Sequence, residues 1–165
     1  MGARKAAPAP APVPQISPVT PLPSVEVRES GVHGLGAFAI RSIPRGQAIG
    51  NYEGRRYSPG EQAEREWNHD LTYVFGLSDG SLIDGSDGGN ATRHINHSCA
   101  PNCQAFEVTS EDGELSIAIE AKRRLKKDEE LSIDYQLEIG EHEPAEYPCR
   151  CGAAACRGTL AASPP

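Results

Sequence analysis

The chain has 165 residues, with 38% apolar residues, 17 glycines and 14 prolines. This length suits one domain with a sizeable hydrophobic core. No apolar run of about 18 residues is present, and no apolar stretch of about 7–15 residues follows Arg4 and Lys5. We therefore expect no membrane partner and no secretory signal.

The formal net charge is −7, from 23 acidic and 16 basic residues. Such a balance argues against a phosphate-binding surface, so the sequence predicts no direct nucleic-acid partner. It favours a basic partner where the partner is charged at all, although solubility is an equally ordinary reason for the charge. The sequence does not set the oligomeric state.

The first element in chain order is a tail rather than a folded segment. Residues 1–24 hold half of the prolines, and alanine and proline alternate from Ala7 to Pro14. This composition is typical of an extended, unpacked chain. It predicts a disordered tail, with a docking or targeting role as the alternative, and a folded part that begins near Val25.

Short strand-like runs separated by glycines and polar turns follow, which predicts a mainly β fold. The runs are Val25–Glu29, Ala37–Ile40, Ala48–Tyr52, Thr72–Leu77, Ser81–Ile83, Gln104–Val108 and Leu115–Glu120. The last two flank Glu111-Asp112-Gly113, which predicts a hairpin. One peripheral helix is expected from Ser58 to about Asn68, because Ser58 can cap it, Pro59 suits its first position and Glu61 completes a capping box.

The five cysteines lie in two places, Cys99 and Cys103 first, then Cys149, Cys151 and Cys156. A disulfide framework would leave one of the five unpaired. A closed structural zinc site takes four ligands in a tetrahedron. The three C-terminal cysteines with one of the first two therefore predict a Zn²⁺ site, with free or oxidised thiols as the alternative.

The first cysteine pair lies in Arg93–Cys103, which also holds two histidines and two asparagines and lacks an amphipathic period. This stretch is one of four motifs that follow one another along the chain. Gly34–Ala39 resembles a G-x-G turn, Arg93–Asn102 the pattern R-F-x-N-H-S-C-x-P-N, Glu130–Tyr135 the pattern E-L-x-x-D-Y, and Cys149–Gly158 the pattern C-x-C-x4-C-R-G. Together they resemble SET-domain protein lysine methyltransferases over about Val25–Leu160.

The resemblance implies a SET-like β-clip of several small sheets. In it the Glu130–Tyr135 segment clasps the chain around Asn96 and His97 as a pseudoknot, and a short zinc-bound post-SET segment follows. The implied division is a tail at 1–24, a SET domain at 25–140 and the post-SET segment with a flexible C-terminus at 141–165. No pre-SET cysteine cluster precedes Val25, so we expect a compact enzyme.

The resemblance also implies an activity, namely methyl transfer from S-adenosylmethionine to a lysine side chain of a basic protein or peptide, histone or histone-like. The implied catalytic residues are Tyr135 and Tyr52. The implied cofactor-binding residues are His33, Gly34, Leu35, Gly36, Tyr73, Arg93, Asn96 and His97. The implied metal ligands are Cys99, Cys149, Cys151 and Cys156, which leaves Cys103 as the spare thiol.

Four positions depart from the family pattern. His94 replaces the usual phenylalanine, and Thr159 replaces an aromatic residue that can pack on the cofactor, which predicts a weaker C-terminal lid. Ala105 and Ile133, in the implied substrate channel, supply no hydroxyl to hold a water beside the amine. Di- or trimethylation is therefore expected.

Two other functions remain open, a catalytically weak zinc-stabilised binding module and a zinc-only interaction domain. The second leaves the glycine turn and the Glu130–Tyr135 motif unexplained. The chain looks bacterial-like in its compactness. In that case the expected location is cytoplasmic or nucleoid-associated, or a host nucleus after delivery.

Overall fold

The computed structural model of the chain describes residues 20–64 and 73–163. Most of the predicted tail, Thr72 and the predicted helix beyond Glu64 lie outside these residues. The described part is mainly β, as predicted, with ten strands, one α-helix and two short 3₁₀ helices. No helix within it is long and apolar enough to cross a membrane.

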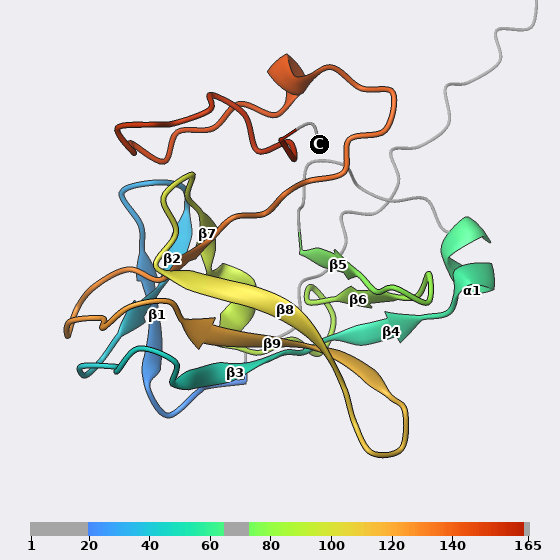
Figure 1. Cartoon of the computed structure of the whole chain (residues 1–165), viewed down its shortest axis with the longest axis horizontal. Helices are drawn as coiled ribbons and strands as arrows, with labels where there is room; N and C mark the ends of the chain where they lie inside the picture. The colour runs from blue at the N-terminus through green and yellow to red at the C-terminus, as the bar shows by residue number, and fades with distance from the viewer. Residues whose placement is uncertain (1–19, 65–72, 164–165) are drawn as a thin grey trace, which may run out of the picture.

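The strands form four small sheets (Figure 1). Two are two-stranded: antiparallel β1 (Val25–Glu29) with β2 (Leu35–Ala39), and parallel β7 (Asn96–His97) with β10 (Ser132–Ile133). Two are three-stranded and antiparallel: β3 (Ala48–Tyr52), β9 (Leu115–Ala121) and β8 (Cys103–Thr109), then β4 (Arg55–Tyr57), β6 (Leu82–Asp84) and β5 (Val74–Gly76).

The predicted hairpin is the β8–β9 pair. Side chains along β9 alternate between buried and half-buried positions, and the buried ones form one face of the core. Ile117, Ile119 and Ala121 are buried, whereas the residues between them are half-buried. The turn closes through the Ser110 N–H, which donates to the Glu114 carbonyl over 2.9 Å, and Gly113 takes φ +82°. A residue without Cβ adopts this left-handed conformation at no steric cost.

The predicted helix start is also present in α1 (Pro59–Glu64). The Glu61 N–H donates to Ser58 Oγ over 3.3 Å, and the Ser58 N–H donates to Glu61 Oε2 over 2.8 Å. These two bonds are the reciprocal capping box, which satisfies amide groups that the first turn leaves free. The helix lies at the edge of the β4–β6–β5 sheet (Figure 1).

One hydrophobic core lies between the sheets, and its largest fully buried apolar side chains are Ile43, Ile83, Ile95, Ile119, Leu125 and Leu131. Ile43 and Leu125 belong to the β2–β3 and β9–β10 connections. Their backbones exchange two hydrogen bonds of 3.1 and 2.8 Å. The core therefore reaches under these loops and fixes them to one another.

Segments far apart in the sequence meet where β7 pairs with β10. The Ser98 N–H donates to the Ile133 carbonyl over 3.0 Å, and Ser132 pairs with Asn96. Buried Asn102 extends this contact, since its amide donates to the Glu130 carbonyl over 2.8 Å. These are the contacts that the clasp expected around Asn96 and His97 requires.

The C-terminal segment after Tyr135 carries no long strand and one 3₁₀ turn, η2 (Pro144–Glu146). It folds back on itself, because the Leu137 N–H donates to the Leu160 carbonyl and the Leu160 N–H donates to the Tyr147 carbonyl. In Figure 1 this orange-to-red segment lies above the ends of β2 and β7. Few backbone bonds hold it, so a cross-link near its end has a large effect on its order.

Candidate active site and metal centre

Four cysteine sulfurs form a cluster between the β7–β8 connection and the C-terminal segment. Sγ atoms of Cys99, Cys149, Cys151 and Cys156 all lie within 4.8 Å of one another. The Cys99 sulfur is 3.8 Å from that of Cys149 and 3.9 Å from that of Cys156. A tetrahedron with Zn–S bonds of ~2.3 Å has S···S edges of about 3.8 Å. The cluster therefore fits a closed tetrahedral Zn²⁺ site.

Backbone amides support the same interpretation, because they approach the sulfurs as donors. The Arg157 N–H donates to Cys99 Sγ over 3.4 Å, and the Gly158 N–H donates to Cys156 Sγ over 3.4 Å. Thiolates accept such bonds readily, and the supporting groups orient metal ligands. Cys103 lies apart on β8, where it is fully buried and burial raises the pKa of its thiol to about 12. It is the spare cysteine.

The imidazole of His97 joins this cluster to the Glu130–Tyr135 segment. Its Nδ1 accepts a hydrogen bond of 3.1 Å from the Tyr135 backbone N–H, so the ring proton belongs on Nε2. Nε2 lies 3.3 Å from Cys99 Sγ. Burial, outweighing the nearby Asp134, lowers the pKa of His97, which keeps the ring neutral. A neutral His97 can therefore donate to the thiolate and accept from Tyr135.

A second connection runs between Arg157 and Asp134. The guanidinium donates two parallel bonds, Nη1 to Oδ2 and Nη2 to Oδ1, each of 2.8 Å. These bonds are the largest cause of the lowered pKa of Asp134. The fork-to-fork geometry fixes both direction and distance. It holds the C-terminal segment against the residue that precedes Tyr135.

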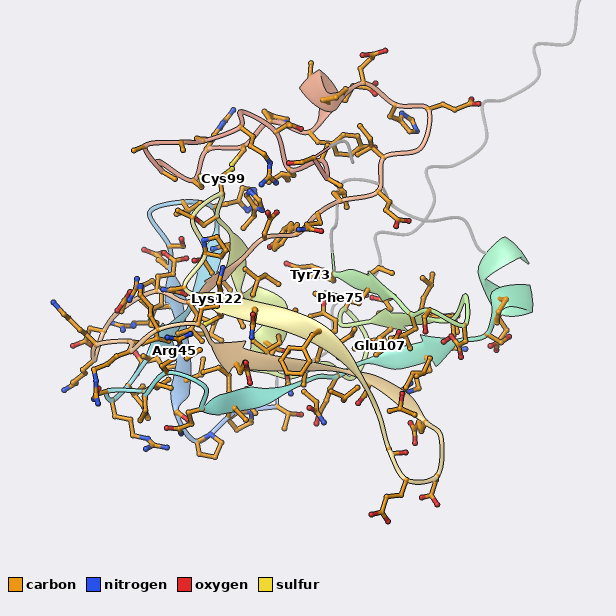
Figure 2. The ribbon with its side chains drawn as sticks, in the orientation of Figure 1. Arg45, Tyr73, Phe75, Cys99, Glu107 and Lys122 are labelled. Atoms are coloured by element: carbon orange, nitrogen blue, oxygen red, sulfur yellow. The ribbon has the colours of Figure 1, made fainter. Side chains whose placement is uncertain are left out.

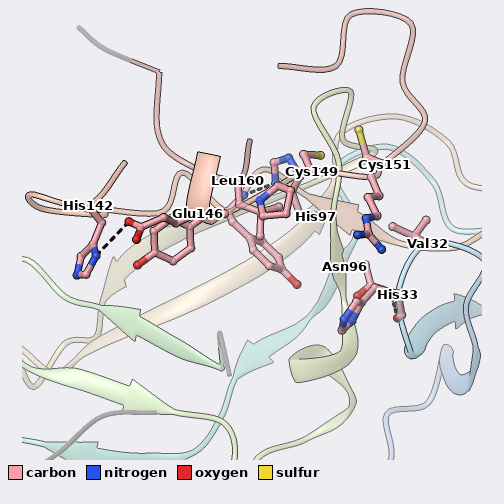
Figure 3. Close-up of a pocket in the computed structure, with 13 residues that line it drawn as sticks. Val32, His33, Asn96, His97, His142, Glu146, Cys149, Cys151 and Leu160 are labelled. Atoms are coloured by element: carbon pink, nitrogen blue, oxygen red, sulfur yellow. Dashed lines mark hydrogen bonds and ion pairs between the residues drawn. The ribbon is translucent and has the colours of Figure 1, made fainter. Parts of the chain in front are cut away.

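A pocket of about 550 Å³ opens beneath the C-terminal segment (Figure 3). Val32, His33 and Asn96 lie at one end in Figure 3, and His142 and Glu146 lie at the other. The remaining lining residues are His97, Tyr135, Tyr147, Pro148, Cys149, Arg150, Cys151 and Leu160. Two of these, Cys149 and Cys151, also belong to the cysteine cluster. The cluster therefore forms part of the pocket wall.

Asn96 organises the end of this pocket where Val32 and His33 also lie. Its side-chain amide donates to the carbonyls of His33 (3.3 Å) and Leu35 (3.0 Å) and to Glu130 Oε1 (2.9 Å). A Cβ on Gly36 would lie 2.4 Å from that same carboxylate oxygen. Gly36 therefore leaves room for Glu130, while Gly34 is required by its φ of +47°. Neither glycine lines the pocket, and Leu35 is an exposed neighbour.

A second pocket, of about 570 Å³, lies on the other side of Tyr135. Seven apolar side chains form part of its wall: Val74, Phe75, Leu77, Leu82, Ile95, Ile133 and Leu137, with Tyr52 beside them. Arg93 also lines this second pocket rather than the first, and its Nη1 donates to the Gly85 carbonyl over 3.2 Å. Arg93 thus supports the apolar side of the site.

Tyr135 lines both pockets. Its hydroxyl donates to the Ile95 carbonyl over 2.9 Å, and its ring meets the His97 ring edge-on at 5.4 Å between centroids. Burial, with smaller effects from Tyr73 and Glu130, raises the pKa of the hydroxyl above 10.0. The phenol stays protonated at neutral pH, so it acts as a hydrogen-bonding group rather than as a base.

Tyr52 and Tyr73 are coupled, but in a supporting arrangement. The Tyr52 hydroxyl donates to the Tyr73 carbonyl over 2.6 Å, and the Tyr52 ring packs on Phe75 at 4.5 Å. Burial raises the pKa of Tyr52 well above its ordinary value. The Tyr73 ring contacts His94 edge-on and lines neither pocket. Burial also lowers the pKa of His94, so a neutral ring stands in the place of the phenylalanine.

The structure brings most of the predicted site together and adds residues that the sequence did not single out. Ile133 lines the second pocket, whereas Ala105 on β8 packs against the core and lines neither pocket. The additions are His142, Glu146, Tyr147 and Leu160 at the first pocket, and Phe75, Leu77 and Glu138 at the second. Of these, Phe75 and Leu77 carried a signal, because both lie in the predicted strand run Thr72–Leu77.

Comparison with known proteins identifies this arrangement. Residues 34–136 match the family model described as the SET domain. Among solved structures, that of Arabidopsis thaliana SUVH6 in complex with SAM superposes with a TM-score of 0.70 and 27% sequence identity, over 86% of this chain and 33% of that one.

Curated relatives match over a similar region. Histone-lysine N-methyltransferase 2B of Homo sapiens is 38% identical over 141 residues, which are 83% of this chain and 5% of the relative. An H3 lysine-4 specific histone-lysine N-methyltransferase of Chaetomium globosum is 35% identical over 142 residues, 82% of this chain and 13% of the relative. The chain thus spans a small part of these relatives. With the family model matched over more than half of its length, the chain belongs to the SET-domain family.

Proposed function

We propose that this chain is a protein lysine methyltransferase that uses S-adenosylmethionine. The observation that carries the proposal is the position of Tyr135, which lines two separate pockets. A group-transfer enzyme needs a donor and an acceptor that meet at one point from separate sites. The names of the relatives and the SAM in the SUVH6 complex support the reaction class.

The first pocket suits the methyl donor. Its volume lies within the range of about 300–1,000 Å³ usual for small-molecule sites. Polar groups of His33, Asn96 and Arg150 and apolar surface of Val32 and Leu160 line it, which matches a ligand that is part charged amino acid and part nucleoside. When bound, S-adenosylmethionine supplies an electrophilic methyl group on sulfur.

We propose that the C-terminal lid over this pocket is formed by Tyr147 instead of the aromatic residue missing at Thr159. Tyr147 lines the pocket, and Thr159 Oγ1 lies within hydrogen-bonding distance of the carbonyls of Pro144 (2.8 Å) and Tyr147 (3.0 Å). Thr159 thus anchors the turn that carries the ring. The prediction of a weaker lid should be tested on Tyr147 rather than on Thr159 alone.

The second pocket suits the lysine side chain. Its walls of Phe75, Ile95 and Ile133 are apolar, and an apolar environment lowers the pKa of an amine because it disfavours the charged form. A free lysine with a pKa near 10.4 is neutral in only about one molecule in a thousand at pH 7.4. Desolvation in this pocket would raise that fraction, and the Tyr135 hydroxyl would orient the amine.

The substrate that we propose is a basic, lysine-containing protein of the histone or histone-like class. Glu138 lines the second pocket, and Glu107 accepts the N–H of Ser78, another lining residue, over 2.7 Å. One carboxylate in the wall and one bonded to it favour a positively charged segment. The chain's excess of acidic residues acts in the same direction.

The same proposal assigns the chain's regions and residues. Residues 25–140 would form the catalytic SET domain and 141–165 the zinc-bound post-SET segment, with 1–24 as a tail. Tyr135 would act at the transferred group, Tyr52 would shape the lysine channel, and Asn96 with His97 would hold the donor. Gly34, Gly36 and Arg93 would act through the residues they position, as their contacts indicate.

The direct test is transfer of labelled methyl groups from S-adenosylmethionine to a panel of histones and small basic proteins, with mapping of the modified lysine. We expect incorporation by the wild type and at least a hundredfold less by Tyr135→Phe, a loss of about 2.7 kcal/mol in transition-state stabilisation. No incorporation into any basic protein, despite thermal stabilisation by S-adenosylmethionine, would favour the alternative of a binding module.

A further inference from the structure

The basic residues of this acidic chain are unevenly distributed. Residues 40–47 and 121–127 contain seven of the 16 lysines and arginines and no acidic residue, so the rest of the chain carries a formal charge of −14 against a total of −7. The seven are Arg41, Arg45, Lys122, Arg123, Arg124, Lys126 and Lys127, all of them exposed. We refer to them as the basic surface.

The fold holds the two segments together. Ile43 and Leu125 are fully buried and exchange two backbone bonds, and the Gly46 N–H donates to the Ala121 carbonyl over 2.8 Å. Side chains next to the buried pair therefore point to solvent on one face. Arg124 Nη1 donates to Ser42 Oγ over 3.2 Å across the junction, which shows that the two segments form one continuous surface.

Most charges of the basic surface are left without a partner. Within residues 20–64 and 73–163, Arg123 pairs with Glu129, but the other six form no ion pair. The nearby acids are engaged elsewhere, since Asp128 pairs with Arg28 and Glu130 accepts from Ser30 and Asn96. Six uncompensated charges on two adjoining loops produce a strong local positive potential.

The chemistry of the surface distinguishes between kinds of polyanion. A protein interface generally needs an apolar centre, and here Ile40 (38% exposed) is the one large exposed apolar residue of the two segments. Single-stranded nucleic acid is generally held by exposed aromatic rings on which bases stack, and neither segment contains an aromatic residue. Lysine and arginine alone contact phosphates without reading sequence.

We propose that the basic surface binds the phosphate backbone of double-stranded DNA, independently of sequence. It lies on the left of Figure 2 with Arg45 and Lys122, whereas Tyr73, Phe75 and Glu107 near the second pocket lie to the right. The expectation of no nucleic-acid partner came from the total charge, which conceals this distribution. The proposal stands independently of methyl transfer, and DNA bound here leaves the lysine pocket free for a DNA-associated basic protein.

The test is fluorescence anisotropy of a labelled 25-base-pair duplex with the zinc-loaded full chain, across salt concentrations. We expect sequence-independent binding with a slope of about −4 in log K against log [salt], as for contacts with four to five phosphates. Arg41→Gln/Arg45→Gln should lower affinity at least tenfold and reduce the slope by about 2. Arg55→Gln/Arg56→Gln on β4 removes the same charge elsewhere and should change neither.

Three results would overturn the proposal. One is equal loss in the two double variants, because binding would then follow total charge. Another is the absence of binding by the wild type at 50 mM salt. The third is equal or tighter binding of a poly-glutamate peptide or of single-stranded DNA of the same length, which would assign the surface to another class of partner. Circular dichroism spectra matching the wild type would confirm that both variants are folded.

Discussion

The backbone N–H of Tyr135 donates a hydrogen bond of 3.1 Å to Nδ1 of His97, while the opposite ring nitrogen lies 3.3 Å from Cys99 Sγ. One neutral imidazole thus connects a metal-site sulfur to the backbone of the residue shared by both pockets. Because the two nitrogens have different partners, a substitution can remove one contact and keep the other.

Two substitutions should separate the two contacts of His97. In His97→Asn, a side-chain oxygen replaces the acceptor near Nδ1 but does not reach Cys99, so zinc affinity should fall ~10–100-fold, the usual cost of losing a supporting contact. In His97→Gln, the amide reaches toward Cys99 but the acceptor for Tyr135 is lost, so kcat should fall with zinc affinity preserved. Competition with a chromophoric chelator and methyl-transfer kinetics measure the two effects. Identical changes in both variants would show that His97 is only a packing residue.

Tyr135→Phe should lower turnover far more than donor affinity. The hydroxyl donates to the Ile95 carbonyl, whereas the ring contact with His97 does not need it. Isothermal titration with S-adenosylmethionine should give a Kd within about threefold of wild type, less than 1 kcal/mol. Tyr147→Phe, which keeps the ring at the first pocket, is the matched control and should retain turnover. Full activity of Tyr135→Phe would refute the catalytic assignment.

Removal of zinc should release the C-terminal segment and weaken donor binding together. Cys149 and Cys151 belong to both the cluster and the first pocket, and few backbone bonds hold the segment otherwise. Structural zinc contributes ~10–16 kcal/mol of apparent binding free energy, comparable to the stability of a whole domain. Hydrogen exchange after chelation should show early loss of protection in residues 137–163 with β8 and β9 still protected. Donor affinity unchanged by chelation would contradict this coupling.

Much of the fold could be predicted from local pattern. β1 and β3 have the expected bounds, since each is an apolar run between turn residues, and the Ser58–Glu61 capping box is a purely local signal. β2 begins at Leu35, two residues before the expected Ala37, because Gly34 completes a turn in which the Ser30 N–H reaches its carbonyl. The two-residue strands β7 and β10 could not be predicted from local pattern, because each exists only through its distant partner, and only the family resemblance implied that they meet.

The candidate site also contains residues that the sequence predicted and residues that only the fold brings there. Spacing predicted a site of the three C-terminal cysteines with Cys99 or Cys103, and the family resemblance implied Cys99. The structure brings Cys99 to the other three and leaves Cys103 apart. The first-pocket residues His142, Glu146 and Tyr147 carry no periodicity or motif, and their placement depends on how the segment folds back onto Leu160. Arg157 stood in a recognised motif, but its partner Asp134 is 23 positions away and only the fold aligns the two forks.

The Arg157–Asp134 pair should make stability depend on acid pH. Because Arg157 lowers the pKa of Asp134 in the folded state, the stabilisation is complete above the unfolded pKa near 3.9 and is lost as pH falls through the lower folded value. Thermal melts of the wild type should therefore show an added loss of Tm below about pH 4. Asp134→Asn should reduce that loss and lower Tm at pH 7. Glu107→Gln removes an exposed carboxylate elsewhere and should leave the loss of Tm at acid pH unaltered. If Asp134→Asn shows the same loss of Tm as the wild type, the Arg157–Asp134 pair is excluded as its source.

The degree of methylation should depend on Ile133. This side chain is 3% exposed, lines the second pocket and supplies no hydroxyl that could hold a water beside the amine. Mass spectrometry of product peptides at exhaustion should therefore show di- or trimethyl lysine for the wild type. Ile133→Tyr adds a hydroxyl and should shift the product toward monomethyl lysine, whereas Ile133→Phe adds the same ring without it and should retain higher products. Both substitutions enlarge a buried side chain and should lower the free energy of unfolding by about 1–3 kcal/mol. The products of the two variants can be compared only if their Tm values are equal. Only monomethyl lysine from the wild type would contradict the assignment, because the space for further methyl groups would then be closed by another residue.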